Sequence, residues 1–195
     1  EVGRTSLCNR RHIELPGAAR VTQRLVDVLD PASYQSRLAG HRAAICTLGV
    51  GQPSQMSKAE FVRIDKDAVL GFARTCKRAG IEHFELLSAV GANPDSSSFY
   101  LRTKGELGIA VRWLQCASVS MCKPSRIRTP GSRDCWSQSL ILGLWPRLGM
   151  FWLGTLRKYR GIHVDNLGAA IANNLLQDQD GLEVLQWDRF MALAK

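Results

Sequence analysis

The stretch "SKAEFVRIDKDAVLGFARTCKRAGIEHFELLSAVGA", residues 57–92, decides the fold class of this 195-residue chain. From Phe61 to Cys76 its apolar residues recur every three or four positions, which predicts an amphipathic helix over 57–80. The apolar run that follows, 81–92, predicts a strand that leaves the sheet at Ser88. A helix that leads directly into a strand is half of a βαβ unit.

Local signals mark both ends of this helix. Ser57 followed by Glu60 is typical of a capping box at a helix start, and Gly80 is typical of a helix end. The segment before the helix, "HRAAICTLGVG" (41–51), predicts a buried strand that runs into a glycine-containing loop. Strand, helix and strand therefore follow one another over 41–92.

The rest of the chain continues this alternation. Strands are predicted in 4–11, 19–30 and 117–125, helices in 98–115 and 164–176 (the latter opened by Asp165), and a strand followed by a helix in 182–195. Strands that alternate with helices of about ten or more residues form a mainly parallel sheet. The chain is therefore expected to be an α/β protein, with no internal repeat.

In parallel sheets of this kind, ligands bind beyond the carboxyl ends of the strands. Three predicted strands end in residues with polar or flexible character: Ser88, Leu48–Gly49 and Arg10–Arg11. Their shared location predicts that they belong to one site.

Tyr100 and Lys104, in "SSSFYLRTKGEL" (96–107), lie four residues apart and so on one face of a helix. A lysine ammonium beside a phenol lowers a pKa that is ordinarily about 10. Such a tyrosine can exchange a proton with a carbonyl or alcohol oxygen while hydride moves to or from a nicotinamide, and Ser88 could orient that oxygen. In the alternative, Tyr100 packs against the sheet and Lys104 is a solvated helix residue.

The composition of the chain limits which classes of protein it could belong to. Hydrophobic residues make up 45% of the chain, as in ordinary globular proteins, and its six cysteines form no CxxC pair. This favours a reduced, cytoplasmic protein without a metal site. The apolar stretch 140–156 is interrupted by Pro146 and Arg147, so no transmembrane segment is expected.

The net charge of +9 is concentrated in 112–160, which holds nine lysines and arginines against Asp134 alone. This basic region could face nucleic acid, an anionic membrane or phosphate groups. Nucleic acid is the weaker interpretation, because no recognition motif accompanies the charge.

Runs from almost the whole chain, in order, resemble one family. The chain is similar to the atypical short-chain dehydrogenase/reductases, in the NAD(P)-binding Rossmann branch of the HIV Tat-interacting oxidoreductase and its bacterial relatives. The runs that carry this resemblance include "CNRRHIELPG" (8–17), "ICTLGVG" (45–51), "SSSFYLRTKGELG" (96–108) and "LRKYRGIHVDNLGAAI" (156–171). The resemblance implies a Rossmann-like sheet with helices on both faces.

The resemblance also implies roles for particular residues. Tyr100 would be the proton donor and acceptor, Lys104 its partner and a ligand of the nicotinamide ribose, and Ser88 the serine at a strand end. Leu48 and Gly49 would line the adenine and ribose side. Ile127 and Arg133 would close over the nicotinamide end or the phosphates.

Arg10 and Arg11 follow a strand at the place where an NAD-specific enzyme carries an acidic residue. Arginines there suit a 2′-phosphate, so NADP(H) is favoured over NAD(H) as the cofactor. The alternative is an exposed basic turn without a ligand.

One departure from the family stands out. The family begins with a strand and a glycine-rich turn that binds the pyrophosphate, and the sequence contains no such motif. Residues 1–195 are thus expected to form a single Rossmann-like domain, incomplete at its N-terminus, whose smaller substrate-side part spans 125–195. The absent strand would lie between those that contain Cys8 and Cys46, so the chain is expected to be unstable and to bind NADP(H) weakly.

Two functions remain open. The first is an NADP(H)-dependent oxidoreductase that acts on a small carbonyl or alcohol through Ser88, Tyr100 and Lys104. The second is an NADPH-sensing or protein-interaction module with a regulatory protein partner and little or no catalysis.

Overall fold

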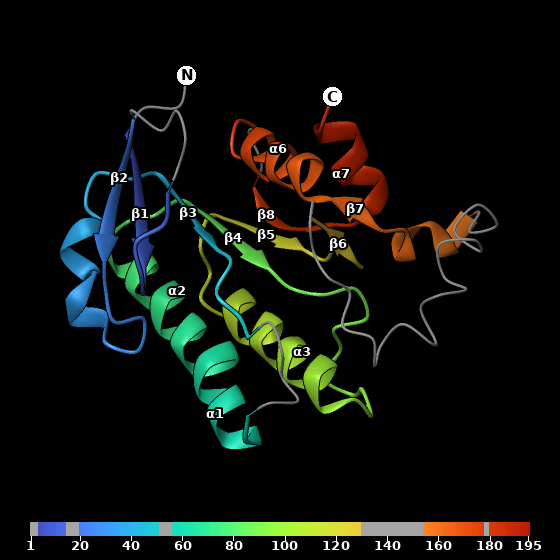
Figure 1. Cartoon of the computed structure of the whole chain (residues 1–195), viewed down its shortest axis with the longest axis horizontal. Helices are drawn as coiled ribbons and strands as arrows, with labels where there is room; N and C mark the ends of the chain where they lie inside the picture. Colours follow the sequence, from blue (N-terminus) through green and yellow to red (C-terminus); the bar gives the residue numbers. More distant parts are fainter. Residues whose placement is uncertain (1–3, 15–19, 51–55, 130–153, 178–179) are drawn as a thin grey trace.

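Parallel strands form the centre of the molecule (Figure 1). The computed structural model describes residues 4–14, 20–50, 56–129, 154–177 and 180–195. One sheet has the order β3-β4-β5-β8 and a second pairs β1 with β2, all in parallel. These strands are β1 (Thr5–Asn9), β2 (Val21–Leu25), β3 (Ala43–Cys46), β4 (His83–Leu87), β5 (Ser118–Cys122) and β8 (Gly181–Leu185).

Helices cover both faces of the four-stranded sheet, as expected (Figure 1). One face carries α1 (Lys58–Val62), α2 (Val69–Arg78) and α3 (Phe99–Arg112), and the other carries α6 (Val164–Asn174) and α7 (Trp187–Leu193). Between α1 and α2 lies the π-helical segment η4 (Arg63–Ala68). The remaining elements are short: η1 (Pro31–Ser33), η2 (Gln35–Arg37), η6 (Gly154–Tyr159), and the pair β6 (Ile127–Arg128) and β7 (Ile162–His163).

The ends of the 57–80 helix are confirmed. The Ser57 hydroxyl accepts from the Glu60 N–H, and the Glu60 carboxylate accepts from the Ser57 N–H, each at 3.2 Å. Gly80 ends the helix at φ +80°, a conformation that costs other residues energy. Asp165 does not open α6: His163 is the cap residue, and Asp165 pairs with it from the first turn at 3.1 Å.

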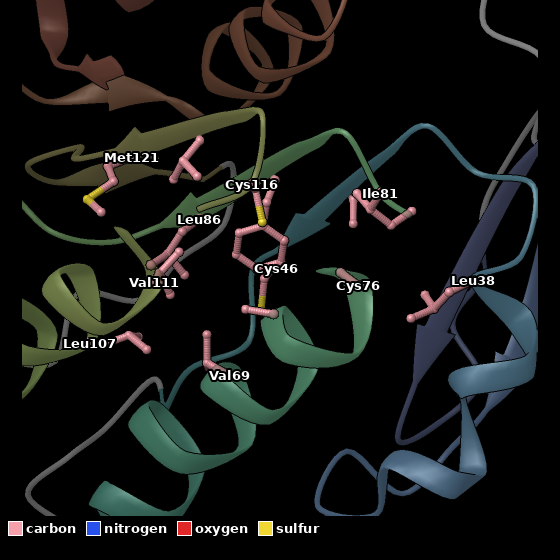
Figure 2. Close-up of a cluster of buried hydrophobic side chains, with 14 of the residues drawn as sticks. Leu38, Cys46, Val69, Cys76, Ile81, Leu86, Leu107, Val111, Cys116 and Met121 are labelled. Carbon is pink, nitrogen blue, oxygen red and sulfur yellow. The ribbon is translucent and has the colours of Figure 1, made fainter. Parts of the chain in front are cut away.

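The interior consists of two apolar clusters, one on each face of the sheet. Successive residues of a strand point to opposite faces, so β4 contributes Phe84 and Leu86 to the cluster under α2 and α3, and Leu87 to the one under α6 and α7. Cys46, Cys76 and Cys116 point into the first cluster (Figure 2). Their burial explains why these cysteines behave as small apolar residues.

The sheet is divided between β1 and β3. Among the described residues, no ladder pairing joins these two strands, although Cys8 of β1 packs against the same apolar cluster that contains Cys46 of β3. The division falls where the sequence analysis expects an absent strand. That a further strand belongs there stays a prediction.

Candidate functional site

Tyr100 and Lys104 occupy the first two turns of α3. The helix begins at this point because the Ser98 hydroxyl accepts a hydrogen bond from the Leu101 N–H at 3.5 Å. Tyr100 is half-buried, with its ring centroid 5.8 Å from that of Phe61 in α1. Lys104 is only 5% exposed. The interpretation of Lys104 as a solvated helix residue is therefore wrong.

The ammonium of Lys104 forms an ion pair with a residue that sequence reasoning did not single out. Lys104 Nζ lies 2.7 Å from Asp65 Oδ1, and the Asp65 side chain is 1% exposed. Asp65 Oδ2 accepts the backbone N–H of Val50 at 2.8 Å. In the described part of the chain, Oδ1 has no hydrogen-bond partner, and its charge is compensated by the Lys104 ammonium.

The loop after β3 lies directly on this ion pair. A Cβ atom on Gly49 would be 3.2 Å from Asp65 Oδ1 and 3.5 Å from Lys104 Nζ. The first distance is shorter than most Cβ contacts, so glycine allows the backbone to approach the two charges this closely. The predicted residues Gly49 and Lys104 are therefore brought together, at the carboxyl end of β3.

Asp65 belongs to the π-helical segment η4, and such segments often occur at functional sites. The next residue, Lys66, bonds Glu106 of α3 at 2.6 Å, so two ion pairs connect η4 to α3. A sequence signal for Asp65 did exist. It lies four residues after Phe61 and four before Val69, which makes it an acidic residue in an apolar stripe.

The electrostatics of Tyr100 differ from the expectation. Burial raises the pKa of Tyr100, and the negative charge of Asp65 raises it further. The prediction that Lys104 lowers this pKa is thus wrong for this structure. Burial of the phenol is the larger cause, and the charge of Asp65, which also compensates the lysine charge, is the second.

Ser88 follows β4 directly, as predicted, and is buried. Its backbone N–H donates to the carbonyl of Cys122 at 2.7 Å, which continues the pairing of β4 with β5. Within the described ranges, no hydrogen bond joins Ser88 to Tyr100 or Lys104. Its role in orienting a substrate stays a prediction.

Within the described ranges, no hydrogen bond or ion pair joins the other predicted residues to Tyr100 or Lys104. Arg10 and Arg11 are exposed after the end of β1, in agreement with a basic turn at a strand end. Leu48 packs partly against the apolar cluster of Figure 2. Ile127 is a partly exposed residue of β6, and Arg133 lies outside the described residues.

No helix in the described part of the chain is long and apolar enough to span a membrane. The apolar stretch 140–156 lies almost entirely outside the described residues.

Comparison with solved structures supports the fold. MoeE5 in complex with UDP-glucuronic acid and NAD superimposes with a TM-score of 0.69, at 18% identity over 93% of this chain and 67% of that one. A dTDP-4-dehydrorhamnose reductase from Bacillus anthracis, in complex with NADP, gives 0.64 at 10% identity, over 95% of this chain and 75% of that one. At these identities the likeness shows a Rossmann-like NAD(P)-binding fold and nothing finer.

Comparison with curated sequences identifies relatives. No family model matches the sequence. Protein FMP52, mitochondrial, from Debaryomyces hansenii is 27% identical over 77% of this chain and 68% of that protein. Protein HTATIP2 from Rattus norvegicus is 30% identical over 98% of this chain and 78% of that protein. This chain therefore belongs to the HTATIP2/FMP52 family, which is related to the atypical short-chain dehydrogenase/reductases with an NAD(P)-binding Rossmann fold.

Proposed function

We propose that the chain is an NADP(H)-dependent oxidoreductase that acts on a small carbonyl or alcohol. The observation that carries this proposal is the burial of Lys104 beside Gly49 at the end of β3, with Tyr100 one helical turn away. A buried lysine is costly unless its charge is compensated, and Asp65 compensates it here, beside the strand end where ligands of such sheets bind. Membership of the chain in the HTATIP2/FMP52 family also supports an oxidoreductase reaction.

The residues fit three parts of the cofactor. Lys104 and Tyr100 would hold the nicotinamide ribose, and the exposed Arg10 and Arg11 would hold a 2′-phosphate, which favours NADP(H) over NAD(H). Gly49 and Leu48 would line the adenine side. The residues do not fit the pyrophosphate, because none of the described strand ends carries a glycine-rich turn that opens a helix.

When bound, the cofactor supplies or accepts the hydride, and the Tyr100 hydroxyl would donate or accept the proton. In the reducing direction the Tyr100 hydroxyl would donate its proton to the carbonyl oxygen, which becomes an alcohol. Ser88 would donate a hydrogen bond to the same oxygen and so align it. Lys104 would hold the cofactor near the phenol.

The experiment is to follow NADPH oxidation with a panel of small aldehydes and ketones, for wild type and for Tyr100→Phe. A loss of at least about a hundredfold in the variant is expected from removal of the proton donor. Tyr159→Phe, which changes a tyrosine outside the site, serves as a matched control. Equal rates in wild type and Tyr100→Phe would contradict the catalytic role.

A second function is favoured by one observation. Burial, and then the charge of Asp65, raises the pKa of Tyr100, and Asp65 compensates the Lys104 charge that would promote loss of the phenol proton in the alcohol-oxidising direction. A module that senses NADPH and binds a regulatory protein partner would tolerate this arrangement. Binding of NADPH, measured by calorimetry, without turnover of any carbonyl would support this second function.

The cytoplasmic location of the protein stays a prediction, which imaging of the tagged protein tests.

A further inference from the structure

We propose that Asp65 is a positioning residue of this site, which fixes the Lys104 ammonium against the loop after β3. The proposal rests on the proposed function, since Asp65 would affect the reaction only through Lys104 and Tyr100. It concerns a residue that the motif Tyr–xxx–Lys does not include.

The geometry assigns a separate partner to each carboxylate oxygen. Oδ1 faces Lys104 Nζ at 2.7 Å, and Oδ2 accepts the Val50 N–H at 2.8 Å. Asp65 thus joins α3 to the loop that follows β3. One buried side chain therefore contacts both the lysine and the loop.

The location of Asp65 supports this role. It is in the π-helical segment η4, between two α-helical stretches. A π turn inserts an extra residue into the helix, which changes the direction in which the following side chains point. The neighbouring Lys66–Glu106 ion pair holds the same segment against α3 from the partly exposed side.

Charge gives Asp65 its second effect. The Lys104 ammonium would stabilise the phenolate of Tyr100 if it were uncompensated. With Asp65 ionised, the pair is neutral overall, and the carboxylate itself disfavours the phenolate. Asp65 is therefore expected to keep Tyr100 protonated, as a proton donor must be before reduction.

The experiment is to titrate Tyr100 in wild type and in Asp65→Asn. The phenolate is followed by near-ultraviolet absorbance, with the matching Tyr100→Phe protein subtracted in each case. Asparagine keeps the shape and can still accept the Val50 N–H but lacks the charge. The Tyr100 midpoint is expected at lower pH in Asp65→Asn than in wild type. Asp67→Asn, an exposed position in the same segment, is the matched control and should leave the midpoint unchanged.

The double variant Asp65→Asn/Lys104→Met separates the effects of the two charges. Both buried charges are then gone, and the Tyr100 midpoint should lie above that of Asp65→Asn because the ammonium is absent. Folding of each protein is checked by far-ultraviolet circular dichroism. A midpoint that is the same in wild type, Asp65→Asn and the double variant would overturn the proposal and leave Asp65 a purely structural residue.

A second readout uses the cofactor. NADPH is expected to bind Asp65→Asn about tenfold or more weakly than Asp67→Asn, because Lys104 is no longer held in place. If neither wild type nor the variants bind NADPH, the proposed function fails. The tyrosine titration, which needs no cofactor, still decides the role of Asp65.

Discussion

Lys104 Nζ and Asp65 Oδ1 lie 2.7 Å apart, and the two side chains are 5% and 1% exposed. Removing one partner of such a pair leaves the other charge buried without compensation, whereas removing both restores neutrality. Replacing either member of the pair in the candidate site is therefore expected to change the stability of the fold.

The first prediction follows from this coupling. Lys104→Met should lower the free energy of unfolding by about 3–5 kcal/mol, and the double variant Asp65→Asn/Lys104→Met should recover most of that loss. Urea denaturation at neutral pH measures both. Arg42→Gln, which breaks the exposed pair of Arg42 and Glu82 at 3.0 Å, is the control and should cost less than about 1 kcal/mol. A loss that is not recovered in the double variant would show that packing, and not charge, explains the effect.

The second prediction concerns the glycine next to Lys104. A Cβ atom on Gly105 would lie 2.2 Å from the carbonyl carbon of Asn93 and 2.3 Å from the nitrogen of Pro94. Both atoms belong to the backbone and cannot rotate away, so α3 would have to move. Gly105→Ala is expected to destabilise the protein by about 2 kcal/mol or more.

Gly168 in α6 provides a matched control, because nothing lies within 4 Å of the position of its Cβ. Gly168→Ala should stabilise the protein by up to about 1 kcal/mol, since alanine is the better helix former. The two variants are compared by thermal and urea unfolding. Equal effects of the two substitutions would refute the close approach of α3 to the 93–94 backbone.

The third prediction concerns a buried carboxyl group on the other face of the sheet. Burial, opposed by a hydrogen bond from Asn174 and assisted by the charge of Glu183, raises the pKa of Glu85 from 4.5 to about 7. Asn174 also donates to the Ser120 hydroxyl at 2.9 Å, and the His83 ring lies 2.8 Å from that oxygen. Glu85 is therefore part of a polar group of residues under α6.

A pKa that is higher in the folded state means that the folded protein holds this proton more tightly than the unfolded chain does. The contribution is complete below about pH 4.5 and is lost as the pH rises through about 7. Relative to wild type, Glu85→Gln should thus gain stability as the pH increases, by up to about 3 kcal/mol at pH 8.

Urea unfolding at several pH values between about 4.5 and 8 tests this dependence. Glu82→Gln, at an exposed position just before β4, should give a difference from wild type without this rise. A flat difference for Glu85→Gln would mean that Glu85 is ionised in the folded state throughout this range.

Much of the fold follows from sequence because its signals are local. The capping box of Ser57 and Glu60, the left-handed Gly80 and the apolar run that contains β4 each act within a few residues. The contact of Asp65 with Lys104 joins residues far apart in the chain, and the π turn that presents Asp65 has no simple pattern. Burial of Tyr100 and the charge of Asp65 raise the pKa of Tyr100, and neither is evident from the spacing of Tyr100 and Lys104 in the sequence.

The fourth prediction concerns the cysteines of the cluster in Figure 2. Burial raises the pKa of Cys46 from 9.0 to about 11, so at neutral pH its thiolate fraction is about a hundredfold smaller than that of a free cysteine. Cys76, fully buried, has its pKa raised for the same reason, by burial first and by neighbouring thiols second. Neither residue should react with iodoacetamide while the protein is folded.

Mass spectrometry of peptides labelled with and without urea measures this reactivity, and the labelling rate of Cys46 should rise at least about a hundredfold in the denatured protein. Rapid labelling of Cys46 in the folded state would instead show that the cluster opens readily to solvent.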